Sequence, residues 1–240
     1  MVCIRFDIKK LEFTKIMYYI QHLGIPVSST IHFFLSKGVP FDTVVLILML
    51  PIIATLIAFF RQILGIKAFG IYTPLLVTFA FLATNGLKYG ITIFITVILV
   101  GMLMRFVLKP FRLLYLPRVA IMLTAVATFI LGVLVLGGSF HRTGLAAVSI
   151  FPILIMITIV EKFVAVQIEK GDKTAIILAI ETLFISSLGF FIASSPTLIK
   201  LIVLYPWIIL FTVPINIFLG KWTGLRFSEY FRFKEIFKHF

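Results

Sequence analysis

Cysteine, acidic residues and charge in general are scarce in this sequence. Cys3 is the one cysteine among 240 residues, which excludes an intramolecular disulfide framework and a cysteine-based metal site. The four histidines are scattered without the spacing of metal ligands, and neither Gly-x-Ser-x-Gly nor His-Glu-x-x-His occurs. Charged residues make up 13% of the chain, against about 25% in a typical soluble domain. We therefore expect no cofactor, no metal and no enzymatic activity.

Apolar residues are abundant instead. They make up 61% of the chain, and the mean hydropathy is +1.18, which is too apolar for a soluble enzyme or a disordered chain. A helix needs about 20 apolar residues to cross a bilayer, and these runs lack the alternation of barrel strands. The sequence therefore predicts an all-α membrane protein with seven transmembrane helices, at 43–60, 68–84, 89–108, 119–140, 143–160, 174–193 and 201–219.

Lysine and arginine predict the orientation. Fourteen of them lie near the span ends of one side and four near those of the other, and the richer side is cytoplasmic. The N-terminus is then outside and the C-terminus is in the cytoplasm. Residues 1–42 form an extracytoplasmic segment, 43–219 the membrane domain and 220–240 a cytoplasmic tail. Translocation of the basic N-terminal segment is explained by a longer gene product or by a reverse signal-anchor.

The tail predicts a short helix lying on the membrane. Its charges alternate in sign at every third residue and are separated by aromatic residues: Arg226, Glu229, Arg232, Glu235 and Lys238. Opposite charges three residues apart support a helix, and aromatic residues with basic ones suit the membrane interface. Nucleic-acid binding is not expected of so short a tethered segment. The net charge of +13 is mainly an orientation signal.

Several short motifs resemble a known bacterial family. The segment 61–70 (RQILGIKAFG), followed by Tyr72-Thr73-Pro74, looks like that family's first cytoplasmic turn. The further motifs, in the same order, are Gly38-Val39-Pro40, Pro117-Arg118, Phe151-Pro152, TIVEK at 158–162, GKWTGLR at 220–226 and SEYFRF at 228–233. The family is the seven-transmembrane domain usually fused to an inactive transglutaminase-like domain, and the resemblance covers residues 36–236.

The resemblance implies a bacterial inner-membrane protein with a transglutaminase-like module outside. Members tend to accompany ATP-grasp amide ligases. Residues 1–35 are far too short for the outside module, so we interpret the chain as a fragment or a split form.

Glu181 is the one acid inside a predicted span. Intramembrane carboxylates are costly and are candidates for proton- or ion-linked function. If the span begins nearer Thr182, Glu181 is instead interfacial, and the sequence leaves both alternatives open.

Two polar turns are the other candidate sites. Glu161-Lys162 is expected to end the fifth span, either as an interface-marking pair or with Glu161 in a cytoplasmic cluster with Arg61, Lys67 or Arg118. The turn that holds Arg61-Gln62 and Lys67 also contains glycines. It could cradle a phosphate or lipid headgroup, although a positive-inside anchor is the favoured interpretation.

Prolines interrupt four of the predicted spans. A proline inside a helix removes a backbone hydrogen bond and kinks the helix, and broken helices line substrate sites in transporters. These prolines are Pro51, Pro74, Pro152, Pro206 and Pro214.

The leading functional hypothesis is a membrane scaffold or signal transducer that couples the outside module to a cytoplasmic protein partner. The alternative is a secondary transporter or permease of a small anionic or peptide-like solute, which would use the kinked spans and Glu181. The absence of an evident inverted repeat weakens the alternative.

Overall fold

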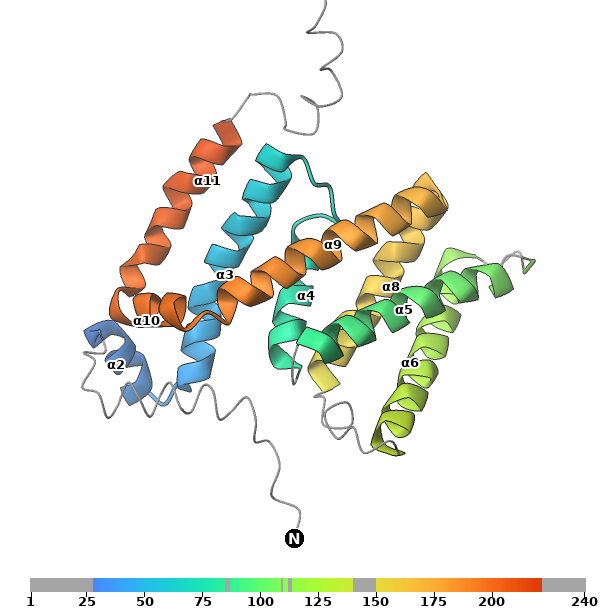
Figure 1. Cartoon of the computed structure of the whole chain (residues 1–240), viewed down its shortest axis with the longest axis horizontal. Coiled ribbons are helices and arrows are strands. Elements are labelled where there is room, and N and C mark those ends of the chain that lie inside the picture. Colours follow the sequence, from blue (N-terminus) through green and yellow to red (C-terminus); the bar gives the residue numbers. More distant parts are fainter. Residues whose placement is uncertain (1–27, 85–86, 109, 112–113, 140–149, 222–240) are drawn as a thin grey trace, which may run out of the picture. The chain divides into compact units, whose positions relative to one another are not determined.

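A computed structural model describes residues 28–84, 87–108, 110–111, 114–139 and 150–221 (Figure 1). The secondary structure in these residues is entirely helical. Its elements are α2 (Ser29–Ser36), α3 (Phe41–Phe59), η1 (Phe60–Leu64), α4 (Tyr72–Ala83), α5 (Leu87–Leu108), α6 (Tyr115–Ser139), α8 (Ile150–Lys170), α9 (Asp172–Ala193), α10 (Pro196–Leu204), η2 (Pro206–Phe211) and α11 (Thr212–Lys221). The junction at 141–142 between the fourth and fifth predicted spans and the predicted tail helix lie outside the described residues.

Among the described residues, five helical segments are long and apolar enough to cross a membrane. They are Thr43–Leu64, Leu87–Leu108, Leu116–Val135, Phe151–Lys170 and Asp172–Ala193. Large apolar side chains remain exposed along them, such as Leu99, Leu103 and Phe106 on α5. So much exposed apolar surface is stable in a lipid environment and not in water. The all-helical membrane class is therefore confirmed, whereas the orientation of the termini stays a prediction.

Two of the seven predicted spans are not straight, full-length helices. The predicted span 68–84 is wrong in its length, because α4 has only 12 residues and an irregular segment precedes it. The predicted span 201–219 is wrong in its shape, because the chain bends by 101° between Pro196–Leu204 and Pro206–Lys221. Pro206 explains the bend: a proline disfavours the helical conformation of the residue before it, and Tyr205 has φ −129° and ψ 71°.

The described chain divides into two compact units. Unit 1 consists of residues 1–66 and 191–240, and unit 2 of residues 67–190. The core of unit 2 brings together side chains from several helices, including Phe81 of α4, Val97 of α5, Met122 of α6 and Phe163 of α8, all at most 1% exposed. The α8 helix contacts α4, α5 and α6, so it is the central helix of this unit.

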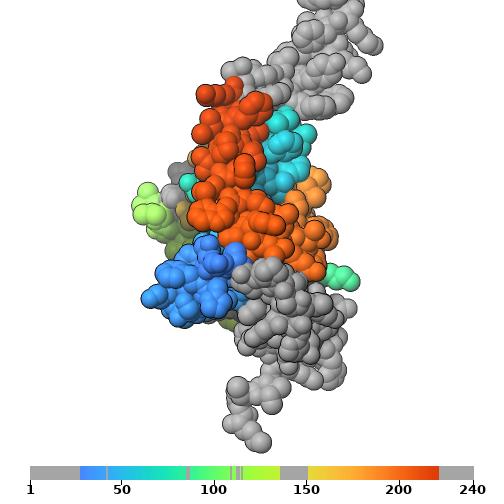
Figure 2. All heavy atoms as spheres, turned by 90° about the vertical axis from the view of Figure 1, so that its left-hand side faces the viewer, coloured from blue at the N-terminus to red at the C-terminus, as the bar shows by residue number. Residues whose placement is uncertain are grey.

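Unit 1 is built on α3 and the η2–α11 helix, which run side by side in the same direction (Figure 1). Asn216 of α11 donates a hydrogen bond of 2.7 Å to the hydroxyl of Thr55 on α3. Thr55 in turn donates to the carbonyl of Pro51, inside α3. Figure 2 shows α2, α10 and α11 on one face of this unit. Polar side chains thus join two otherwise apolar helices, as is common in membranes.

Glycine permits close packing at two positions of α5. A Cβ at Gly90 would lie 2.5 Å from Cδ1 of the fully buried Phe81, and one at Gly101 would lie 3.1 Å from Cγ1 of Val160. We expect Gly90→Ala to lower the free energy of unfolding in detergent by about 1–3 kcal/mol, because the Phe81 ring must move.

Gly132 on α6 is the matched control for this substitution. Nothing lies within 4 Å of a Cβ built there, so Gly132→Ala should be neutral or stabilising through the higher helix propensity of alanine. Both variants are compared by circular dichroism during denaturant unfolding in mixed micelles. Equal stability of the two variants would contradict the packing argument.

Candidate functional site

The side chain of Glu181 accepts two backbone hydrogen bonds from a segment more than 100 residues away. Its Oε2 atom lies 2.9 Å from the amide nitrogen of Lys67 and 2.9 Å from that of Ala68. The next amide, that of Phe69, donates to Oγ1 of Thr182 at 3.1 Å. Three consecutive amides are thereby held by two consecutive residues of α9, all within unit 2.

The backbone conformation of residues 67–71 directs these three amides toward the side chains of Glu181 and Thr182 on α9. Ala68 has φ +41°, which is uncommon for a residue with a Cβ, and Gly70 has φ +89°. Successive amides that converge in this way form an anion-binding concavity. The anion bound by this turn is the protein's own Glu181 carboxylate. The sequence favoured a positive-inside anchor over a phosphate or lipid-headgroup site for the turn; its Lys67 and Ala68 amides donate to Glu181.

A second group of hydrogen bonds continues from this turn along α4 and α9. Ser186 donates to the carbonyl of Pro74 at 3.0 Å, and Thr78 donates both to Pro74 at 2.8 Å and to the carbonyl of Ser186 at 3.3 Å. Thr182 donates to the carbonyl of Leu178 at 2.7 Å. Thr78, Thr182 and Ser186 are fully buried. Buried polar groups that are satisfied in this way fix the register of one helix against another.

The hydrogen bonds that Glu181 accepts define what the site can do. Glu181 is the tenth residue of α9, which is about 14 Å of helix rise from its first residue, and it is half-buried. A carboxylate that accepts hydrogen bonds from amides is a strong, charge-assisted acceptor. The arrangement can therefore act as a fastening between the turn and α9.

Glu161 and Lys162 do not end the fifth helix, which corrects the expected boundary. The α8 helix continues to Lys170. It continues because Val160, Phe163, Val164 and Gln167 remain buried at helical spacing. Glu161 and Lys162 themselves lie on the exposed side of α8. The proposed cluster of Glu161 with Arg61, Lys67 or Arg118 stays a prediction.

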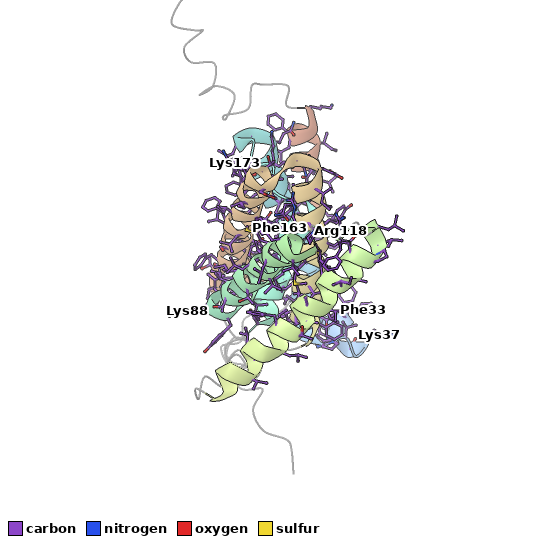
Figure 3. The ribbon with its side chains drawn as sticks, turned by 90° about the vertical axis from the view of Figure 1, so that its right-hand side faces the viewer. Phe33, Lys37, Lys88, Arg118, Phe163 and Lys173 are labelled. Carbon is purple, nitrogen blue, oxygen red and sulfur yellow. The ribbon has the colours of Figure 1, made fainter. Side chains whose placement is uncertain are left out.

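The other predicted residues occupy several places. Arg61 and Gln62 lie in the π-helical turn η1 that follows α3, in unit 1. Arg118 lies half-buried near the start of α6. Figure 3 shows Lys173 toward one end of unit 2 and Lys88 toward the other.

The predicted kink prolines have different positions in their helices. Pro51 is inside α3 and Pro206 begins the segment after the bend. Pro74 and Pro152 are in the first turns of α4 and α8, where a backbone donor has no helical partner to lose. Pro214 follows the change from the 3₁₀-helix η2 to α11.

Sequence reasoning missed three polar residues that the structure brings together. Arg105 at the end of α5 forms an ion pair with Asp172 at the start of α9 and donates to the carbonyl of Gln167 at 3.1 Å. The side chain of Gln167 is only 1% exposed. Within the described residues, neither its Nε2 nor its Oε1 has a hydrogen-bond partner. The sequence did contain a signal for this site, because Gln167 lies at helical spacing from the apolar residues Val160, Phe163 and Val164.

The fold and the short motifs both agree with one known protein family. Residues 27–237 match the family model described as seven transmembrane helices usually fused to an inactive transglutaminase. The chain belongs to this family. No match was found among curated proteins or among solved structures. The resemblance seen in the short motifs is thereby confirmed, and the protein is a multi-pass membrane protein of the seven-transmembrane transglutaminase-associated family.

The described residues contain no group of three histidine, cysteine, aspartate or glutamate side chains placed to hold a metal ion.

Proposed function

We propose that this protein is the membrane-embedded part of a transducing scaffold in a bacterial inner membrane. The observation that carries the proposal is the fastening of residues 67–69 to Glu181 and Thr182. The chain passes from unit 1 into unit 2 at residues 66–67, and it returns through α9 at residues 190–191. Residues 67–69, just after the chain enters unit 2, are thus hydrogen-bonded to Glu181 and Thr182 of α9, the helix through which the chain returns. In the proposed scaffold, a displacement of this turn is transmitted to α9.

The partners follow from the family and from the predicted topology. The family is usually fused to an inactive transglutaminase, so a transglutaminase-like module is the expected partner on the extracytoplasmic side. The basic cytoplasmic face, with Lys170 and Lys173 at the ends of α8 and α9, suits an acidic protein partner. A link to an ATP-grasp amide-ligase pathway would place that partner in amide-bond formation.

The first test uses a module taken from a fused member of the family. The module is expressed as a separate exported protein, and this chain is purified from the same membranes. We expect the module to copurify with this chain and not with an unrelated seven-helix protein. Recovery no greater than with the unrelated protein would count heavily against the scaffold.

A second candidate function, solute transport, is favoured by one specific observation. The α4 helix is short and follows irregular backbone, and the chain segment from α10 to α11 is bent by 101°. Short or broken helices of this kind mark substrate sites in secondary transporters. The candidate solutes are small anionic or peptide-like molecules.

Uptake into proteoliposomes distinguishes transport from scaffolding. If the protein is a transporter that uses Glu181, uptake of an anionic or peptide-like solute should fall in the Glu181→Gln variant. Uptake that is insensitive to the substitution removes Glu181 from the mechanism. The scaffold proposal expects no uptake above that of empty liposomes for either protein.

A further inference from the structure

The α2 and α10 helices of unit 1 each come directly before a membrane-crossing segment of the chain. The α2 helix ends at Ser36, and Gly38 with φ +84° turns the chain into α3, which begins at Phe41. The α10 helix ends at Leu204, directly before the segment that crosses beside α3. The amide of Ser28, which caps α2, donates to the carbonyl of Val203 in α10 at 3.5 Å. The start of α2 therefore lies beside the end of α10.

The bend gives α10 a direction different from that of a membrane-crossing helix. The segment Pro196–Leu204 lies at 101° to Pro206–Lys221. If the second segment follows the membrane normal beside α3, α10 lies almost in the plane of the membrane. The depth of α2 in the membrane follows from α3. The apolar span of α3 begins at Thr43, only a few residues after α2 ends. That depth is the boundary between hydrocarbon and headgroups.

Each helix has a buried apolar side and an exposed side of interfacial composition. Ile31 of α2 and Ile199 and Ile202 of α10 are buried. The exposed side chains of this region include aromatic and basic ones: Phe33, Phe34, Lys37, Lys200, Tyr205 and Trp207. Aromatic residues of this kind concentrate at membrane interfaces, and lysines there reach the headgroups. Lys37 Nζ lies 5.8 Å from the centre of the Phe33 ring, so the charge is already placed beside an aromatic side chain.

We propose that α2 and α10, with Tyr205 and Trp207, form an interfacial shelf that lies in the lipid headgroup layer. Its occupant is lipid: headgroups contact Lys37 and Lys200, and the aromatic side chains lie at the upper end of the acyl chains. A position in the hydrocarbon centre would leave Lys37 and Lys200 in a medium that strongly disfavours charge. The shelf holds the first span and the final crossing segment at one depth in the membrane.

Trp207 provides a direct test, because the chain contains only two tryptophans. Trp222→Phe leaves Trp207, which is 67% exposed, as the single reporter in the full chain. The protein is reconstituted into vesicles whose phosphatidylcholine carries bromine either near the headgroup or near the chain end. We expect the shallow bromines to quench Trp207 roughly twice as strongly as the deep ones, as for an interfacial aromatic residue.

A deep reporter calibrates the measurement. Leu99 is exposed near the middle of α5, so Leu99→Trp in a chain that also carries Trp207→Phe and Trp222→Phe should be quenched more by the deep bromines.

If Trp207 behaves like this reporter, the bend lies inside the bilayer as a re-entrant segment and the proposal is overturned. Quenching of Trp207 by aqueous iodide but by neither lipid would place the shelf in water. Protection from all three quenchers would show that another protein covers it. Either result also overturns the proposal. Trp222→Tyr replaces Trp222→Phe if the latter reduces helix content.

Discussion

Glu181→Ala is expected to lower the free energy of unfolding by about 2–4 kcal/mol, because two backbone amides lose a charged acceptor. The amides of Lys67 and Ala68 both donate to its Oε2 at 2.9 Å, and Ala68 is only 6% exposed. Water cannot readily replace the lost acceptor in an apolar environment. The measurement is denaturant unfolding in mixed micelles, followed by circular dichroism.

Two further variants separate the hydrogen bonds from the charge. Glu181→Gln keeps an oxygen acceptor but removes the charge. Its free energy of unfolding should therefore fall by only about 1 kcal/mol, the difference between a charged and a neutral hydrogen bond. Glu161→Ala removes an exposed carboxylate from α8, and it should stay within about 0.5 kcal/mol of the unchanged protein. If Glu181→Ala were no less stable than Glu161→Ala, the fastening would have no energetic weight and the proposed coupling would lose its support.

The second large effect is expected in the opposite direction. Gln167→Leu should raise the free energy of unfolding by about 1–3 kcal/mol, because a buried amide without hydrogen-bond partners carries a desolvation cost of that size. The side chain is 1% exposed, and both its polar atoms lack a partner among the described residues. Leucine replaces the amide by apolar atoms that suit the neighbouring Phe163 and Val164. The same unfolding measurement applies.

Asn216 is the control for the substitution of an amide in this protein. Its Nδ2 donates to Thr55 on α3 and to the carbonyl of Thr212, so Asn216→Leu should be destabilising by about 1 kcal/mol. Opposite signs for the two variants would show that the difference arises from hydrogen bonding. A loss of stability in Gln167→Leu would show instead that the Gln167 amide binds a polar group in the membrane.

The family and the membrane class could be predicted because both depend on local sequence. Apolar runs long enough to cross a bilayer leave the helix as the stable backbone structure, since every amide must be satisfied within its own segment. The family motifs are likewise continuous pieces of chain, such as residues 61–70, and the family match extends over residues 27–237. Neither inference required knowledge of which helices are neighbours.

Helix lengths and ends were predicted less well where packing competes with hydropathy. Glu161-Lys162 resembles the polar end of a span, but α8 continues because Phe163, Val164 and Gln167 are buried beyond that pair. The run 201–219 is apolar throughout, but Pro206 divides it, and the two parts differ in direction by 101°. Hydropathy averages over a window, so it does not register a change of backbone direction at one residue.

The sequence by itself determined that Glu181 is an acid in an apolar run, and that a glycine-containing basic turn with Arg61, Gln62 and Lys67 follows the first span. Only the tertiary structure decided that these two features bind each other. The hydrogen bond from Lys67 to Glu181 spans 114 residues, and it forms because packing brings α9 against the turn before α4. Local patterns fix which atoms can donate and accept. Which donor meets which acceptor depends on the arrangement of distant helices, and no local pattern contains that arrangement.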